Sequence, residues 1–255
     1  MKNALLIVRK ELLELRRSPV LLLSMTSLPA TVVVVPVLLL AWLVRAAPEQ
    51  ALAFVTDLYG VHEGGLQASV ASVLARNWLP MFLVLPIFLP ILLAAQSIGG
   101  ERERRTLEPL LATQASTLSI ILGKSIAALV PALVITWVAA ALFCAGIDLV
   151  IGSVLLPDAA WLFGTLVLSP LLALFGNAMA VVVSSRVLDP RAAQNLAATT
   201  VLPLLGLLVV QLAGRIALGP RFYGALALGV LLADVALVFA AVRLFDRERL
   251  LTHWR

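Results

Sequence analysis

The sequence predicts an all-α integral membrane protein that crosses the bilayer with six transmembrane helices. Of its 255 residues, 62% are hydrophobic and only 13% are charged, whereas soluble domains are about 25% charged. Six apolar runs are long enough to cross the hydrocarbon layer, which takes about 20 helical residues. Lys and Arg are concentrated in alternate connections between these runs, as in multi-pass membrane proteins.

The six runs occupy most of the chain, so we expect one membrane domain over residues 1–255 and no sizeable soluble domain. The predicted spans are residues 20–44, 78–98, 125–147, 159–184, 195–213 and 222–242. Fifteen of the 19 Lys and Arg lie in residues 1–19, 99–124, 185–194 and 243–255. Because cytoplasmic connections are enriched in these residues, both termini are predicted to be cytoplasmic. The same bias accounts for the net charge of +5 without a nucleic-acid partner.

The first element, within residues 1–19, is predicted to be a basic amphipathic helix. Residues 2–17 repeat apolar side chains at a three-four spacing. The predicted apolar face contains Leu5, Val8, Leu12 and Leu15. A helix of this kind lies on the inner membrane surface, and Ser18 and Pro19 suit the start of the next helix. The alternative is that residues 2–17 extend the first span into water.

The extracytoplasmic loop, residues 45–77, is the longest connection between spans. Two short helices are predicted there, at residues 48–59 and 66–78. Paired glycines, Gly64 and Gly65, favour a turn between them. His62 and Glu63 stand in this turn, and because no second histidine is near, they predict a solvated turn and not a metal site.

The cytoplasmic connection at residues 99–124 carries the clearest functional pattern. Its start, Gly-Gly-Glu-Arg-Glu-Arg-Arg, mixes charges of both signs and therefore stays in water. Thr106 suits the cap of a short helix, with Glu108 in the favourable first turn. Leu107, Leu110 and Leu111 would form an apolar face on that helix. Exposed leucines on a short helix fit a groove in a partner, and the alternative is a solvated connector.

The end of this connection, Gly123-Lys124-Ser125, imitates the end of a phosphate-binding loop. That motif requires a Gly five residues before Gly123, where the sequence has Leu118, and it must follow a strand. Neither condition holds. Lys124 is instead predicted to anchor the inner end of the third span by snorkelling or by contact with lipid headgroups. We therefore expect no ATP, metal or other cofactor to be bound by this chain itself.

The pattern of residues 99–125 and the six predicted spans resemble the membrane (permease) subunit of ABC-2-type ABC transporters. The family pattern reads Glu-Arg-Glu-x-Gly-Thr-Leu-Glu, followed by Leu-Leu-Ala-Thr-Pro. Arg105 and Gln114 depart from it, at the places of the usual Gly and Pro. The positions that match are Glu101, Arg102, Glu103, Thr106, Leu107, Glu108, Leu110, Leu111, Ala112 and Thr113.

The resemblance implies a short coupling helix in this loop that docks into a separate ATP-binding subunit. The expected contacts to that subunit are Glu101, Arg102, Glu103, Arg105, Thr106, Leu107, Glu108, Leu110 and Leu111. Two ATP-binding subunits would hold ATP and Mg²⁺, and a second membrane subunit, identical or different, would complete the translocation pathway. The resemblance further implies an exporter in the inner (plasma) membrane of a prokaryote, with a non-catalytic role for this chain.

Polar residues inside the spans are the candidates for substrate contact. Asp234 lies near the middle of the last span, where a charge is costly, so it should face a partner helix or a wet cavity, or be protonated. It is either a substrate or ion contact or a structural pair. Asn177, Gln96 and Gln211 cost less to bury and can bond across helices. Which substrate is carried is not readable from these residues.

Two other functions compete with the transporter subunit. The chain could be a non-transporting membrane scaffold that anchors an ATPase. It could also be an intramembrane lipid-modifying enzyme with Asp234 as an acid or base, although no second convergent acid accompanies this residue. The sequence has two His far apart and one Cys, Cys144, inside an apolar run, which argues against metal or thiol catalysis.

Overall fold

A computed structural model describes residues 2–46, 66–103, 117–184, 187, 189–212 and 219–244. All regular elements in these ranges are helical, which confirms the predicted all-α class. Six helical stretches are long and apolar enough to cross a membrane. They are Pro19–Arg45, Val70–Ala95, Leu122–Ile151, Ala159–Ser184, Arg191–Gln211 and Arg221–Ala240. Each corresponds to one predicted span.

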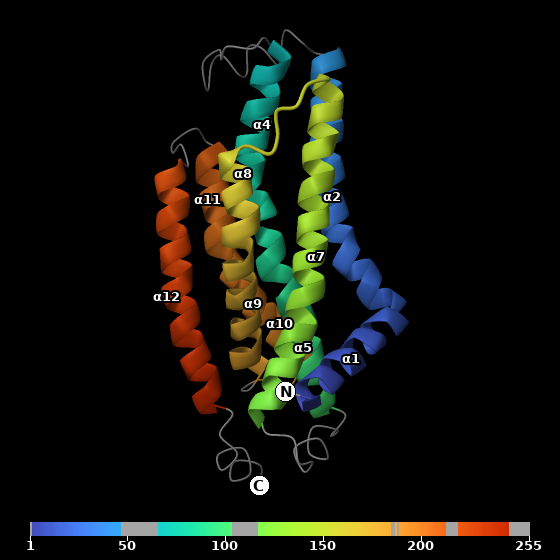
Figure 1. The fold of residues 1–255 in the computed structure, drawn as a ribbon, viewed down its shortest axis with the longest axis vertical. Helices are drawn as coiled ribbons and strands as arrows, with labels where there is room; N and C mark the ends of the chain where they lie inside the picture. Colours follow the sequence, from blue (N-terminus) through green and yellow to red (C-terminus); the bar gives the residue numbers. More distant parts are fainter. Residues whose placement is uncertain are drawn as a thin grey trace.

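The spans run alternately up and down side by side, and one helix lies obliquely across their lower end (Figure 1). That oblique helix is α1 (Lys2–Arg17), and we call this end of the bundle the α1 end. The helices that follow are α2 (Pro19–Ala46), α4 (Leu66–Phe82), α5 (Val84–Glu103), α7 (Thr117–Ile151), α8 (Ala159–Phe163), the π-helical turn η1 (Gly164–Leu168), α9 (Ser169–Ser184), α10 (Pro190–Ala198), the 3-10 turn η2 (Thr199–Val201), α11 (Leu202–Leu212) and α12 (Pro220–Leu244). The last turn of α12 also lies at the α1 end (Figure 1).

The separation of α1 from the first span agrees with the predicted break at Ser18. The Ser18 Oγ accepts from the backbone N–H of Leu21 at 3.4 Å, and Pro19 opens α2, where a missing N–H leaves no helical bond unmade. Residues 2–17 therefore form a separate helix that turns away from α2, and the alternative of one continuous helix is wrong.

The second span begins earlier than the sequence indicated. The helix predicted at residues 66–78 is the first part of α4, which continues without a break into the second membrane span. Asn77, the last residue of the predicted loop, lies within this helix, and its Nδ2 donates to the Val73 carbonyl at 2.9 Å, so the helix itself satisfies the amide. Arg76 is exposed. The turn predicted at His62 and Glu63 lies outside the described residues.

The centre of the bundle is α5. Between Val84 and Ala95 every residue except Phe88 is buried, because α5 packs most extensively against α9 and also contacts α10 and α7. At Gly176 of α9, an added Cβ would come against the backbone of Ile87 in α5. Such close approach through a small residue is typical of helix packing in membranes. The helix that leads into the predicted coupling loop is therefore held on several sides.

Candidate functional site

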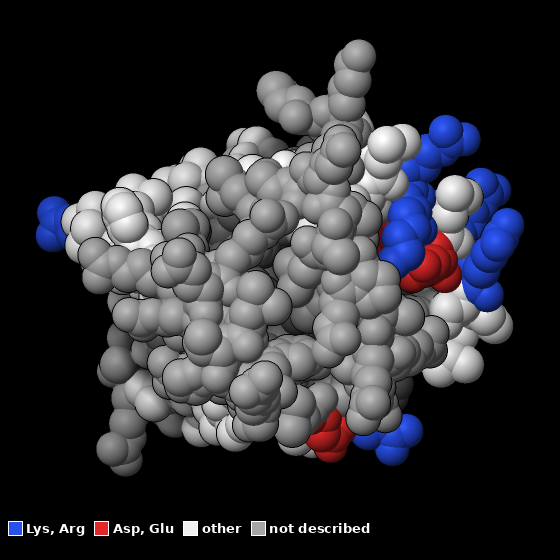
Figure 2. Space-filling view, turned by 90° about the horizontal axis from the view of Figure 1, so that it is seen from below, with Lys and Arg blue, Asp and Glu red and all other residues white. Residues whose placement is uncertain are grey.

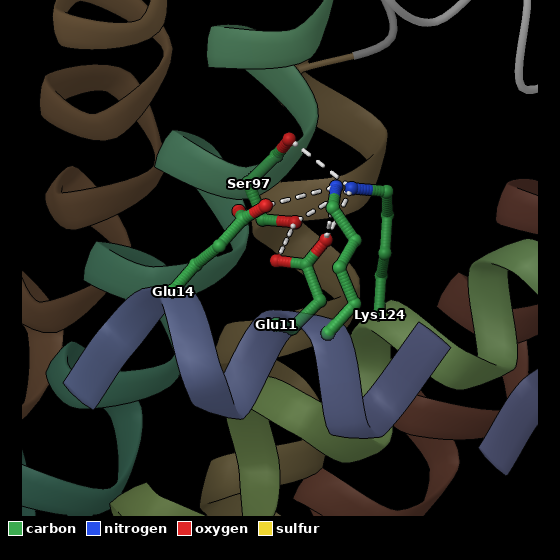
Figure 3. Close-up of polar contacts among 5 residues, drawn as sticks. Glu11, Glu14, Ser97 and Lys124 are labelled. Atoms are coloured by element: carbon green, nitrogen blue, oxygen red, sulfur yellow. Dashed lines mark hydrogen bonds and ion pairs between the residues drawn. The ribbon is translucent and has the colours of Figure 1, made fainter. Parts of the chain in front are cut away.

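Three side chains from three helices meet at the α1 end (Figure 3). The Lys124 Nζ, from α7, lies 2.9 Å from the Glu11 Oε1 of α1. It also donates to the Ser97 Oγ of α5 at 2.8 Å and to the Ser97 carbonyl at 3.2 Å. The Ser97 Oγ in turn donates to the Glu11 Oε2 at 2.8 Å. We call Glu11, Ser97 and Lys124 the α1 clasp.

The clasp exists because Glu11 belongs to the packed face of α1. Ile7 is buried and Leu15 packs against the core, and with Glu11 between them the three residues recur every four positions on one side of the helix. Leu5 was predicted on the apolar face, but its side chain is 68% exposed. The packed face is thus rotated from the predicted one, since an ion pair lets an acidic residue take a place in it.

Both charges of the clasp are withdrawn from solvent. The side chain of Lys124 is 4% exposed and that of Glu11 is 12% exposed. Burial raises the pKa of the Glu11 carboxyl, but the charge and hydrogen bond of Lys124 and the hydrogen bond from Ser97 outweigh burial, so its pKa lies below the ordinary value. Glu11 is therefore ionised at neutral pH. The predicted snorkelling of Lys124 to lipid headgroups is wrong, because the ammonium group turns inward to Glu11.

The clasp lies at the base of the connection between the second and third spans. Ser97 is about two helical turns before Glu103, the last residue of α5, and Lys124 is about two turns after Thr117, the first residue of α7. The clasp thus joins α1 to both helices that flank residues 104–116. A displacement of either helix end at this loop would act directly on α1.

The predicted coupling residues fall into two groups. Glu101, Arg102 and Glu103 form the last turn of α5, where the structure describes a helical backbone that continues through Gly99 and Gly100. The glycines therefore do not end the helix. The remaining residues lie outside the described ranges, and they are Arg105, Thr106, Leu107, Glu108, Leu110 and Leu111. Their contact with a partner stays a prediction.

The polar residues within the spans behave differently from one another. Gln211 is buried, and its Nε2 donates to the Arg76 carbonyl at 3.2 Å, which joins α11 to α4. Asn177 and Asp234 are each 5% exposed. Among the described residues, the Asn177 Oδ1, the Gln211 Oε1 and both carboxylate oxygens of Asp234 have no hydrogen-bond partner. Gln96 lies in α5, and its side chain is not described.

The structure does not bring these intramembrane residues together. Within the described ranges no hydrogen bond links Asp234 to Asn177 or Gln211, and no three His, Cys, Asp or Glu are grouped as metal ligands. Asp234 stands out because buried polar groups in membranes are normally satisfied. Unlike the uncharged amide of Asn177, whose Oδ1 also lacks a partner among the described residues, Asp234 places an ionisable group there.

The clasp is expected to contribute measurably to the stability of the folded chain. Glu11→Gln should lower the free energy of unfolding at pH 7 by about 3 kcal/mol, because it leaves the buried Lys124 charge unpaired. The matched control is Glu14→Gln, which breaks the exposed pair between Lys10 and Glu14 at 3.4 Å and should cost less than about 0.5 kcal/mol. Thermal unfolding in detergent, followed by tryptophan fluorescence, measures both. Equal melting temperatures of Glu11→Gln and Glu14→Gln would contradict a structural role for the clasp.

The pH dependence of this contribution has a definite sign. Because the pKa of Glu11 is lower in the folded chain than its ordinary value of 4.5, the stabilisation is fully present above about pH 4.5 and is lost as the pH falls through the lowered pKa. The difference in the free energy of unfolding between the native protein and Glu11→Gln should therefore be constant from pH 8 to about pH 5 and disappear only in stronger acid. A difference that disappears near pH 6.5 would point to another group.

A sequence-family profile described as ABC-2 family transporter protein matches residues 5–225. The match begins within α1 and ends within α12, so it includes the whole α1 clasp and the connection at residues 104–116, but it stops before Asp234. No curated protein matches the chain.

Proposed function

The chain belongs to the ABC-2 family of transporter proteins, and from this we propose that it forms the translocation pathway of an ATP-driven exporter together with a second membrane subunit. The family implies partnership with ABC ATP-binding subunits. We infer that two copies of such a subunit hold ATP and Mg²⁺ and dock on the coupling helix in residues 104–116. This chain is then the non-catalytic membrane part of the assembly.

The observation that carries the proposal is the position of α5. This helix is the most enclosed of the bundle, and it leads directly into the predicted coupling residues at the α1 end. When the end of a helix that is surrounded by packed neighbours is displaced, the neighbours move with it, because a close-packed interior has low compressibility. Closure of the ATP-binding subunits would therefore tilt α5 with α7 and α9 as a rigid body and alternate access to the pathway.

The orientation follows from charge. The α1 end holds α1 with its exposed Arg9, Arg16 and Arg17, and segments rich in Lys and Arg remain in the cytoplasm. We propose that this end faces the cytoplasm of a prokaryotic cell, with the loop at residues 47–65 outside. A Thr106→Cys label site in a Cys144→Ala background tests this. A membrane-impermeant maleimide should react with Thr106→Cys only in inverted vesicles or opened cells.

The central experiment is purification of the tagged chain from its own membranes in mild detergent. The complex should contain an ABC ATP-binding subunit, and it should hydrolyse Mg·ATP in lipid vesicles. The purified chain alone should neither bind nor hydrolyse ATP. Substrate or lipid turnover by the chain alone without ATP would favour the enzyme alternative. A complex whose ATP hydrolysis is independent of every span substitution would favour the scaffold.

The role of Asp234 gives a prediction within this function. Asp234→Leu should raise the free energy of unfolding by about 1–3 kcal/mol, because it removes a buried carboxylate that has no partner in the described part of the chain. If Asp234 contacts substrate, the same variant should lose export while ATP hydrolysis by the complex remains.

The matched control is Gln211→Leu, which removes the bond to the Arg76 carbonyl and should destabilise the chain by about 1 kcal/mol. Thermal unfolding shows whether each variant is stabilised or destabilised, and this measurement does not require knowledge of the substrate. Destabilisation of Asp234→Leu by more than Gln211→Leu would show that the carboxylate has a structural partner.

A further inference from the structure

The side of α1 that faces away from the bundle carries exposed basic and apolar side chains that take no part in the clasp. Figure 2 looks onto the α1 end and shows a group of Lys and Arg side chains on the side where α1 lies. Arg9, Arg16 and Arg17 are exposed there. Leu5, Leu6 and Leu13 are exposed with them, at 68%, 64% and 46%. We call these six residues the outer face of α1.

The acidic residues of α1 do not neutralise the outer face. Glu11 turns inward to Lys124, and Glu14 pairs with Lys10 on its own helix at 3.4 Å. Among the described residues, no ion pair is formed by Arg9, Arg16 or Arg17. The clasp thus has a second effect besides joining three helices. By removing Glu11 from the surface, it leaves the outer face cationic.

The depth of α1 is fixed by its partners in the clasp. Ser97 lies four residues before the charged last turn of α5, which begins at Glu101, and Lys124 lies next to the predicted third span, residues 125–147. A helix bonded to both residues lies at the boundary between the hydrocarbon layer and the headgroups. At that boundary leucines enter the acyl region and arginines meet phosphate groups.

We propose that the outer face of α1 binds the phosphate groups of anionic phospholipids, and that the clasp makes ATP hydrolysis by the assembled transporter depend on them. The second half of this inference rests on the proposed function, whereas the first half does not. Guanidinium groups bind phosphate with paired hydrogen bonds. The exposed leucines favour a phospholipid over a soluble phosphate compound, because only a lipid also covers apolar side chains.

The dependence on lipid follows from the path of contacts. Anionic lipid holds α1 at the membrane surface, α1 holds Ser97 and Lys124 through Glu11, and these residues set the ends of α5 and α7 beside residues 104–116. In a neutral membrane α1 would be held less firmly. The coupling loop would then be presented to the ATP-binding subunit in a less uniform position.

The test uses the complete complex in vesicles of phosphatidylcholine, with and without about 30% phosphatidylglycerol. We expect ATP hydrolysis to be several-fold faster with the anionic lipid. Replacing one arginine, as in Arg16→Gln, should weaken the apparent affinity for phosphatidylglycerol about fivefold. The matched control is Arg191→Gln, which removes an exposed arginine of α10 at the same end of the bundle and should leave that affinity unchanged. Inorganic phosphate should not replace the lipid.

A second readout separates lipid binding from the proposed function. A spin label at Leu13→Cys, in the Cys144→Ala background, reports the depth of α1 without any ATP-binding subunit. The label should lie deeper in vesicles with phosphatidylglycerol, and Arg16→Gln with Arg17→Gln should abolish the difference. A depth that does not respond to anionic lipid overturns the inference. If the depth responds to anionic lipid but no ATP-binding subunit copurifies with the chain from its own membranes, the proposed function fails and the lipid site stands.

The link through the clasp has its own test. Glu11→Gln should keep the lipid-dependent depth of the Leu13→Cys label but lose the lipid dependence of ATP hydrolysis. If Glu11→Gln keeps both responses, the clasp does not carry the effect. Because Glu11→Gln is expected to be less stable, these measurements are made well below its melting temperature.

Discussion

Leu107→Asp is expected to abolish assembly with the ATP-binding subunit while the chain still inserts into the membrane and folds. Leu107 belongs to the apolar face predicted for the coupling helix, together with Leu110 and Leu111. A carboxylate buried in an apolar groove loses its hydration without gaining a partner. Loss of a central apolar contact of this kind weakens binding by more than about 100-fold. Copurification with the ATPase and ATP hydrolysis by the complex measure the effect.

The matched control for this substitution is Ser116→Asp, in the same connection but off the leucine face. It adds the same charge to the same loop and should leave the complex intact. Glu108→Arg, which reverses a charge beside the leucines, should weaken the complex and make the loss smaller at high salt. If Leu107→Asp copurifies with the ATPase as well as Ser116→Asp does, the leucine face is not the contact.

Much of the fold was predictable because the bilayer imposes a length. A helix needs about 20 apolar residues to cross, so composition alone marks each span in the sequence. The end of a span is less well marked, as α4 shows. Asn77 is polar but bonds to the Val73 carbonyl one turn earlier, and a helix can therefore carry such a residue within its length.

The α1 clasp was not predicted because its partners are far apart in sequence. Glu11 lies 86 residues from Ser97 and 113 residues from Lys124, and no helical periodicity relates them. A signal was nevertheless present. Glu11 interrupts a helix of three-four apolar spacing, and Lys124 stands at the edge of an apolar span. Burying two opposite charges as a pair costs less free energy than burying either charge without a partner.

The intramembrane candidates were predictable as residues but not as a site. Gln211 bonds to the Arg76 carbonyl, which fits the packing role expected of a buried amide in a membrane. For Asp234 the sequence left substrate contact and structural pairing open. The described part of the chain contains no hydrogen-bond partner for its carboxylate, so both alternatives stay predictions.

The crossing of α5 and α9 is expected to have a large effect on stability. An added Cβ at Gly176 would lie 3.0 Å from the carbonyl carbon and 3.1 Å from the Cα of Ile87, and closer still to the Ile87 carbonyl oxygen. These are backbone atoms of the most enclosed helix, so no side-chain rotation relieves the contact. Gly176→Ala must therefore push α5 and α9 apart, which should cost about 3 kcal/mol.

The matched control for Gly176→Ala is Gly229→Ala in α12. Nothing lies within 4 Å of an added Cβ at Gly229, and Ala favours a helix by about 1 kcal/mol over Gly in soluble peptides, so this variant should be as stable as the native chain or more so. Thermal unfolding should place Gly176→Ala about 8 °C below Gly229→Ala. Because α5 leads into the coupling loop, the surviving folded fraction of Gly176→Ala should also bind the ATPase but hydrolyse ATP more slowly. Equal melting temperatures would mean that α5 and α9 are not held as closely as the structure places them, and the rigid transmission through α5 would lose its basis.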